Sequence, residues 1–127
     1  AMKQQPLRIQ VSLDPRVLTT EISMCSSASA ILHLIAPWVD RPVFNEIHMA
    51  TALYGLGRLR QSFMSEVESS SVLTMLLRRI QFALDTDGMD ARHVGTIVWV
   101  VGRLQRWIER FRELLPALVQ AAQTRAG

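Results

Sequence analysis

The chain has 127 residues, of which 49% are hydrophobic, and a formal net charge of +3. This length is typical of one domain and the hydrophobic content suffices for a core, which excludes collagen-like, disordered and disulfide-scaffold proteins. No apolar run reaches the roughly eighteen residues of a membrane helix, and we expect no insertion into a membrane. The single cysteine, Cys25, can form no internal disulfide, which favours a reducing compartment.

The cationic side chains are almost all arginine. Lys3 is the only lysine among 14 Lys and Arg residues. The guanidinium group binds phosphate through a planar fork of donors and also stacks on bases, which the lysine ammonium does poorly. The composition is therefore compatible with RNA binding, and equally with a GC-rich genome that favours arginine codons.

The first 25 residues are expected to form an extended tail. Residues 6–13, PLRIQVSL, alternate apolar and polar side chains with the period of a β-strand, and Pro6 and Pro15 bracket them. A single strand has no partner in an otherwise helical chain, so the segment is either a tail or an edge strand that pairs with another molecule. We predict a tail over residues 1–25 and expect it to contact neighbouring proteins.

From residue 26 onward the sequence aligns with itself at an offset of 45 residues, which places Gly57 on Gly102. The alignment has no gap and indicates an internal repeat. It predicts units at 26–70 and 71–115 and a partial unit at 116–127, with two helices in each complete unit. We therefore predict an all-α fold: a short right-handed α-solenoid of about two and a half helical hairpins, preceded by the tail.

Each predicted helix begins at a residue that can accept hydrogen bonds from the free amides of the first turn. Serines open the first helix of each unit, in SSASAILHL and SSVLTMLL. Asn45 and Asp90 open the second helix.

The second helix of each unit has two apolar faces and one polar stripe. At about 100° per residue, Met49 and Leu53 lie on one apolar face, and Tyr54 and Gly57 lie on the other. Gly57 and Gly102 are expected to let a neighbouring helix approach closely, which would offset the roughly 1 kcal/mol that glycine costs in a helix. The stripe is expected to line the inner surface of the solenoid. It contains His48, Thr51, Gly55, Arg58 and Ser62 in the first unit and His93, Thr96, Val100, Arg103 and Trp107 in the second.

The stretch FNEIHMATALYGLGRL, residues 44–59, resembles the signature helix of the octotricopeptide-type repeats of algal organelles. Those repeats are similar to repeats of apicomplexan organellar proteins and to the helical region of the FAST-kinase family. The shared pattern is an Asn near the cap, a stretch of small residues, and an aromatic residue followed by Leu, a small residue, a basic residue and Leu. The second copy departs from it, because Val98 and Val101 replace leucines and Asp90 replaces the Asn.

The resemblance implies sequence-guided binding of organellar RNA in the mitochondrion or, alternatively, the plastid. Two repeats are too few to select an RNA sequence if each reads one nucleotide. We therefore expect a small structural or assembly subunit of a larger ribonucleoprotein, such as the mitochondrial ribosome. Neighbouring proteins of that complex would contact the ends of the solenoid.

Arg58 and Arg103 are expected to contact successive phosphates. The other stripe residues His48, Thr51, His93 and Thr96 would contact bases or sugars. A basic rim would be added by Arg78, Arg79, Arg106, Arg110 and Arg112. For the two histidines, the alternative is a hydrogen bond at the end of a helix inside the fold. Tyr54 and Trp99 are more typical of a core than of a stacking platform.

No catalytic or metal-binding signature is present in the sequence. His33, His48 and His93 are too scattered for an HExxH motif or a Cys/His cluster. The stretch DTDGMD, residues 85–90, lacks the glycine and glutamate spacing of a calcium loop, and we interpret it as a turn punctuated by Gly88. We expect no enzyme activity and no cofactor.

The rival hypothesis is a protein scaffold within an organellar complex. RNA binding would be favoured if Arg58, Arg103 and at least one of Arg78 and Arg79 lay on one continuous exposed face. Acidic residues interleaved on that face, or a buried stripe of His, Thr and Arg, would favour the scaffold.

Overall fold

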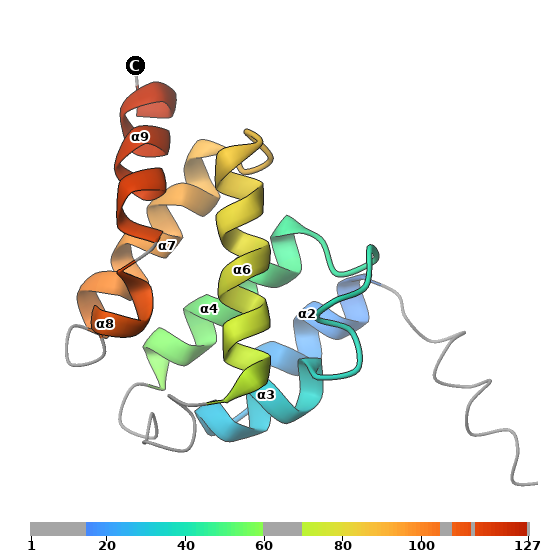
Figure 1. Cartoon of the computed structure of the whole chain (residues 1–127). Helices are drawn as coiled ribbons and strands as arrows, with labels where there is room; N and C mark the ends of the chain where they lie inside the picture. The colour runs from blue at the N-terminus through green and yellow to red at the C-terminus, as the bar shows by residue number, and fades with distance from the viewer. Residues whose placement is uncertain (1–14, 60–69, 105–107, 113, 127) are drawn as a thin grey trace, which may run out of the picture.

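The computed structural model describes residues 15–59, 70–104, 108–112 and 114–126, and these form helices and their connections. No strand occurs among them, so the all-α prediction is confirmed. In chain order the helices are α2 (Pro15–Ser23), α3 (Ala28–Ile35), α4 (Glu46–Arg58), α6 (Ser71–Asp85), α7 (Ala91–Arg103), α8 (Ile108–Phe111) and α9 (Leu114–Ala126) (Figure 1).

The end of the predicted tail is helical, so the extended conformation expected there is wrong for residues 15–23. Pro15 is the first residue of α2, a position where its missing amide has no intrahelical partner to lose. Leu18 and Ile22 lie one turn apart and are buried in the core, where α2 packs against α4. The strand-like alternation of residues 6–13 lies outside the described residues.

The helix starts follow the prediction from capping residues. The side chain of Asn45 accepts hydrogen bonds from two amides of the first turn of α4, and Asp90 accepts one at the start of α7. Ser27 caps α3 and Ser70 caps α6 in the same way. Because the repeat places equivalent caps before equivalent helices, α4 and α7 begin at matching positions and have the same length.

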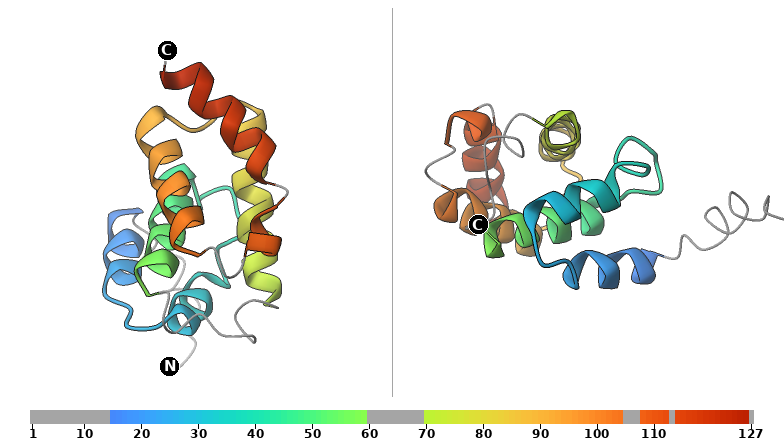
Figure 2. Two further views of the ribbon diagram at one scale, coloured as in Figure 1. Left: turned by 90° about the vertical axis from the view of Figure 1, so that its left-hand side faces the viewer. Right: turned by 90° about the horizontal axis from the view of Figure 1, so that it is seen from below.

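The helix α4 lies at the centre of the molecule and packs against α2, α3, α6 and α7. The two views of Figure 2 show α2, α4 and α7 lying side by side on one side of the molecule, with α6 and α9 on the other. The repeated helices α4 and α7 pack directly on each other, and α9 packs against both α6 and α7. The helices α6 and α7 follow each other in the chain and were predicted to be partners in one hairpin. Each of them has a more extensive contact with α9 than with the other.

Gly57 lies where α4 and α7 approach each other, as predicted. A Cβ atom at Gly57 would come within 3.2 Å of Val100 and 3.3 Å of Trp99. At Gly102, however, a Cβ atom would meet nothing within 4 Å, so the same expectation is wrong for the second copy. Gly55, expected in the polar stripe, is instead buried, and a Cβ there would lie 2.6 Å from Ile31 Cδ1.

The turn between α6 and α7 is a Schellman motif, in which two amides beyond the helix bond back to carbonyls of its last turn. The amide of Gly88 donates to the Ala83 carbonyl at 2.7 Å, and that of Asp87 donates to the Leu84 carbonyl at 3.4 Å. The left-handed residue of the turn is Asp87, with φ of 63°, and not Gly88. Aspartate tolerates this conformation better than most residues.

No helix in the described part of the chain is long and apolar enough to cross a membrane.

Candidate nucleic-acid interface

His48 is part of the core and does not belong to a surface stripe, so its predicted contact with RNA is wrong. Its side chain is fully buried and its ring stacks on that of Phe44, with centroids 5.4 Å apart. The Nδ1 atom accepts a hydrogen bond from the Asn45 amide at 3.0 Å, which completes a reciprocal capping box at the start of α4. The alternative role weighed for the histidines, a bond at the helix end, is the one that His48 has.

His93 occupies the same place at the start of α7, but its side chain keeps 16% of its surface exposed. Its amide donates to the Asp90 carboxylate at 2.9 Å. Its Nδ1 lies 3.2 Å from the same carboxylate in an electrostatic contact whose geometry is not that of a hydrogen bond. The bond from the His93 amide, assisted by the nearby charges of His93 and Arg92, lowers the pKa of Asp90.

Arg79 is a structural residue, and its predicted place in a basic rim is wrong. Its guanidinium reaches the segment between α3 and α4 and donates to three backbone carbonyls there. The acceptors are Val39 at 2.7 Å, Arg41 at 3.0 Å and Phe44 at 2.6 Å. Three of its five donors are bound to these carbonyls, so Arg79 holds the segment between α3 and α4 in place.

Arg58 is exposed at the end of α4, but its guanidinium bridges to the end of α2. It donates to the Ser23 and Cys25 carbonyls, both at 3.3 Å. These bonds satisfy carbonyls at a helix C-terminus, which stabilises the position of α2. Burial raises the pKa of the neighbouring Cys25 thiol, against a smaller opposite effect of the Arg58 charge, so this thiol is poorly nucleophilic.

Tyr54 and Trp99, expected in the core, lie on the surface side by side. The Tyr54 side chain is 45% exposed and that of Trp99 is 42% exposed. Their rings stack with centroids 5.2 Å apart and an interplanar angle of 26°. The Arg103 guanidinium lies over the Trp99 ring, 5.1 Å from its centroid. The two aromatic residues and Arg103 thus form one continuous row across α4 and α7.

The exposed stripe is displaced from the predicted one by part of a helical turn. On α4 and on α7 its residues are separated by four, three and four positions, and each residue on α7 lies 45 positions after its counterpart on α4. We call it the α4–α7 stripe, and it consists of Ile47, Thr51, Tyr54 and Arg58 with Arg92, Thr96, Trp99 and Arg103. Thr51, Thr96, Arg58 and Arg103 were predicted to lie on it.

Arg92 was missed by the sequence reasoning. It is the counterpart of Ile47 at the offset of 45 residues, and it precedes Thr96 by one helical turn. This spacing places it on the same face as Thr96, and it could have been found by continuing the stripe one turn toward the helix start. The apolar Ile47 at the equivalent position concealed that signal.

The stripe borders a hollow between α2, α4 and α7, which we call the α2–α4–α7 hollow. One part has a volume of about 320 Å³, and an adjoining part beside Trp99 has about 520 Å³. Among the described residues, those that line it are Thr19, Ser23, Ala50, Thr51, Tyr54, Arg92, His93, Gly95, Thr96 and Trp99. None of them is acidic, so the hollow presents positive and neutral groups to a ligand.

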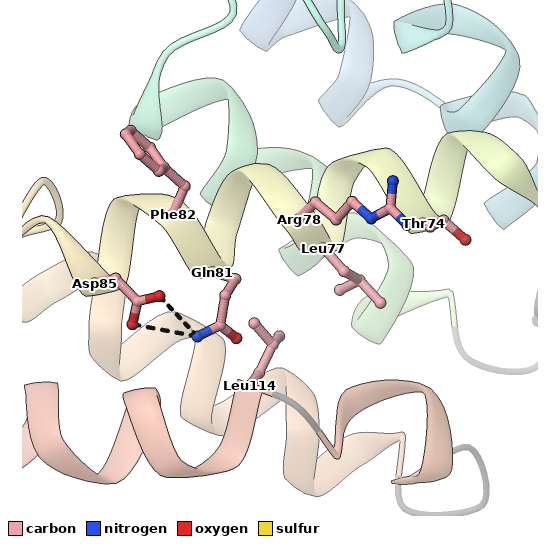
Figure 3. A pocket seen from close by; sticks show the side chains of 7 residues that line it. All are labelled: Thr74, Leu77, Arg78, Gln81, Phe82, Asp85 and Leu114. Carbon is pink, nitrogen blue, oxygen red and sulfur yellow. Dashed lines mark hydrogen bonds between the residues drawn. The ribbon is translucent and has the colours of Figure 1, made fainter.

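Arg78 belongs to a different surface, a cavity of about 440 Å³ between α6 and the start of α9. In Figure 3, Leu77 and Gln81 point toward Leu114 of α9, while Phe82 points to the other side of α6. The Gln81 amide nitrogen donates to both carboxylate oxygens of Asp85. Because Asp85 adds a negative charge, this cavity is less suited to phosphate than the α2–α4–α7 hollow.

The predicted arginines therefore do not form one face. Arg58 and Arg103 lie on the α4–α7 stripe, Arg78 lies on α6, and Arg79 is bound to backbone carbonyls. Arg112 pairs with Glu109 at 2.7 Å. Ser62, Arg106 and Trp107 lie outside the described residues, as does the side chain of Arg110 in α8. Of the predicted residues, Thr51, Thr96 and His93 line the hollow, and Arg58 and Arg103 lie on the stripe at its border. The structure adds Arg92, Tyr54 and Trp99 to the lining.

Within the described residues, no group of His, Cys, Asp and Glu side chains could hold a metal ion. Comparisons with models of known protein families, with curated proteins and with solved structures find no match for this chain. The similarity of residues 44–59 to octotricopeptide-type repeats accordingly remains a prediction from the sequence.

Proposed function

We propose that the protein is a non-enzymatic RNA-binding helical-repeat protein that binds single-stranded RNA along the α4–α7 stripe. In this proposal it is a short right-handed solenoid and a small structural or assembly subunit of a larger organellar ribonucleoprotein. The mitochondrial ribosome, or its plastid counterpart, is an assembly of this kind. The observation that carries the proposal is the exposed row of equivalent residues from the two repeats, with Tyr54 stacked on Trp99 beside Arg103.

The chemistry of the stripe supports single-stranded nucleic acid as the ligand. Exposed aromatic side chains stack with bases of any sequence, which is worth about 1–3 kcal/mol per base. Arg92 and Arg103 are exposed at the two ends of α7 and provide charge for the phosphates between. Thr51 and Thr96 lie between these groups and offer hydroxyls to sugars or bases.

The direct test is binding of labelled single-stranded RNA across a salt series, with the double variant Arg92→Ala/Arg103→Ala. Each phosphate contact that is lost should reduce the slope of log affinity against log salt by about 0.7. The control is Arg78→Ala/Arg112→Ala, which removes two exposed arginines elsewhere and changes the net charge equally. Absent binding, salt-independent affinity, or equal effects of the two double variants would refute the proposal.

A steric test uses two glycines of α7 that differ in position but not in available space. A Cβ atom at Gly95 or at Gly102 would meet nothing within 4 Å, so both positions accept a larger side chain. Gly95 lines the hollow and Gly102 does not. We expect Gly95→Leu to weaken RNA binding at least about tenfold, which corresponds to about 1.4 kcal/mol, and Gly102→Leu to leave it within about twofold.

A protein scaffold is the second candidate, and exposed apolar side chains away from the stripe favour it. Phe82 on α6 is 67% exposed and Val119 on α9 is 55% exposed. In that case the chain should remain in the organellar complex after nuclease digestion. Phe82→Ser/Val119→Ser should release it, while Arg92→Ala/Arg103→Ala should not.

A further inference from the structure

Three hydroxyl groups at the α2–α4–α7 hollow donate their only hydrogen to their own helix. Ser23 Oγ donates to the Thr19 carbonyl at 3.0 Å, Thr51 Oγ1 to the Ile47 carbonyl at 2.8 Å, and Thr96 Oγ1 to the Arg92 carbonyl at 3.2 Å. A hydroxyl has one hydrogen and two lone pairs. While the hydrogen stays in this bond, each of these oxygens offers a ligand only its lone pairs.

These three oxygens come from three different helices and line the same part of the hollow. Tyr54 lines that part with them, and Arg92 lies at its edge with its charge exposed. The volume of about 320 Å³ is at the lower end of the range for small-molecule pockets and accommodates a group of the size of one nucleotide. The hollow thus combines a set of hydrogen-bond acceptors, an aromatic ring and one cation.

We propose that the α2–α4–α7 hollow selects hydrogen-bond donors of a bound nucleotide, and this inference rests on the proposed function. The donors available in RNA are the exocyclic amino groups of adenine, cytosine and guanine, the ring N–H groups of guanine and uracil, and the ribose 2′-hydroxyl. Such donors would bond to Thr51 and Thr96, while Tyr54 stacks on the base and Arg92 binds the phosphate. Uracil is disfavoured, because its one ring N–H can donate to only one of the two threonine oxygens, and the carbonyl oxygens on either side of it would face the lone pairs of the hydroxyls.

The test compares oligomers of adenine, cytosine and uracil of about eight nucleotides, a typical length for single-strand binding sites, in ribose and deoxyribose forms. If amino groups are the donors, the adenine and cytosine oligomers should bind about three- to tenfold more tightly than uracil with either sugar. If the 2′-hydroxyl is the donor, ribose oligomers should bind more tightly than deoxyribose oligomers with every base. Equal affinity for all six would overturn the inference and leave RNA binding itself intact, whereas no binding of any oligomer would refute the proposed function as well.

Valine substitutions separate the hydroxyl oxygens from the shape of the hollow. Thr51→Val/Thr96→Val removes two acceptors and keeps the branched side chain, so we expect the preference to fall to within about twofold, with the smallest loss of affinity for the deoxyribose uracil oligomer, which has neither an amino group nor a 2′-hydroxyl. The matched control is Thr20→Val, because Thr20 makes the same bond to the carbonyl four residues earlier, at 2.9 Å, but is exposed and does not line the hollow. A preference that survives the double substitution would overturn the inference, and circular dichroism verifies that the helices are intact.

Discussion

Two glycines in the same motif have opposite surroundings, which gives a prediction for single residues. Gly102 has open space around it, so Gly102→Ala should raise the free energy of unfolding by about 1 kcal/mol through helix propensity. Gly57 faces Val100, whose branched side chain is fully buried and cannot turn away. We expect Gly57→Ala to lower the free energy of unfolding by about 1–3 kcal/mol.

Urea unfolding monitored by circular dichroism measures both changes. The two variants are each other's control, because they make the same substitution at equivalent positions of α4 and α7. A stabilisation of similar size at both positions would show that the α4–α7 contact is looser than described.

Two adjacent arginines of α6 provide a second prediction at the scale of single residues. Arg79 bonds to three carbonyls of the segment between α3 and α4, whereas Arg78 is exposed. Arg79→Ala should lower the free energy of unfolding by at least about 2 kcal/mol, because bonds to charged groups are worth about 1.5–3 kcal/mol each. Arg79→Lys should recover only part of this, since an ammonium cannot reach all three acceptors. Arg78→Ala should change the free energy of unfolding by less than about 0.5 kcal/mol in the same thermal or urea measurement. Similar losses at the two positions would contradict the structural role of Arg79.

At the scale of helices, the cap of α7 should make stability depend on pH. The His93 amide lowers the pKa of Asp90 in the folded state, so the stabilisation is present above the pKa of the unfolded chain and is lost as pH falls through the folded pKa. Asn is an equally good cap and does not titrate, as Asn45 illustrates at α4. Asp90→Asn should therefore reduce the loss of melting temperature between neutral pH and about pH 2. An unchanged loss would mean that the carboxylate does not hold the helix start.

Helix starts were the part of the fold that the sequence predicted best. Asn45 and Asp90 were identified because capping depends on one side chain and the amides next to it, which is local chemistry. The helix α2 was missed because a proline is compatible with both a strand boundary and a first helical turn, and Pro15 was taken as the former. Burial of Leu18 and Ile22 against α4 decides between the two, and that contact is not local.

The candidate site was predicted only in part, for a related reason. Thr51, Thr96 and Arg103 follow from helical spacing. Tyr54 and Trp99 were assigned to the core because large aromatic residues are usually buried, yet α4 and α7 meet at the edge of these rings and leave both about half exposed. Which face of a helix remains open depends on the neighbours it packs against, and the repeat alone does not specify them.

At the scale of the whole molecule, the contacts of α4 predict that the chain unfolds as one unit. Extended solenoids are stabilised by nearest-neighbour terms and can lose their ends separately. Here α4 contacts α2, α3, α6 and α7, and α9 contacts both α6 and α7, so neither end depends on a single neighbour. The buried side chains of α2 and α9 belong to one continuous core.

We therefore expect Ile22→Ala in α2 and Leu118→Ala in α9 each to lower the free energy of unfolding by about 2–5 kcal/mol. Both should do so by lowering the midpoint of one and the same transition. Circular dichroism and tryptophan fluorescence should give coincident curves for both variants, as a two-state transition requires. The exposed neighbours supply controls, since Val17→Ala and Val119→Ala lie on the same two helices and should shift the midpoint little. Two separate transitions, with Ile22→Ala moving one and Leu118→Ala the other, would show instead that the ends are coupled only through their nearest helices, as in an extended repeat array.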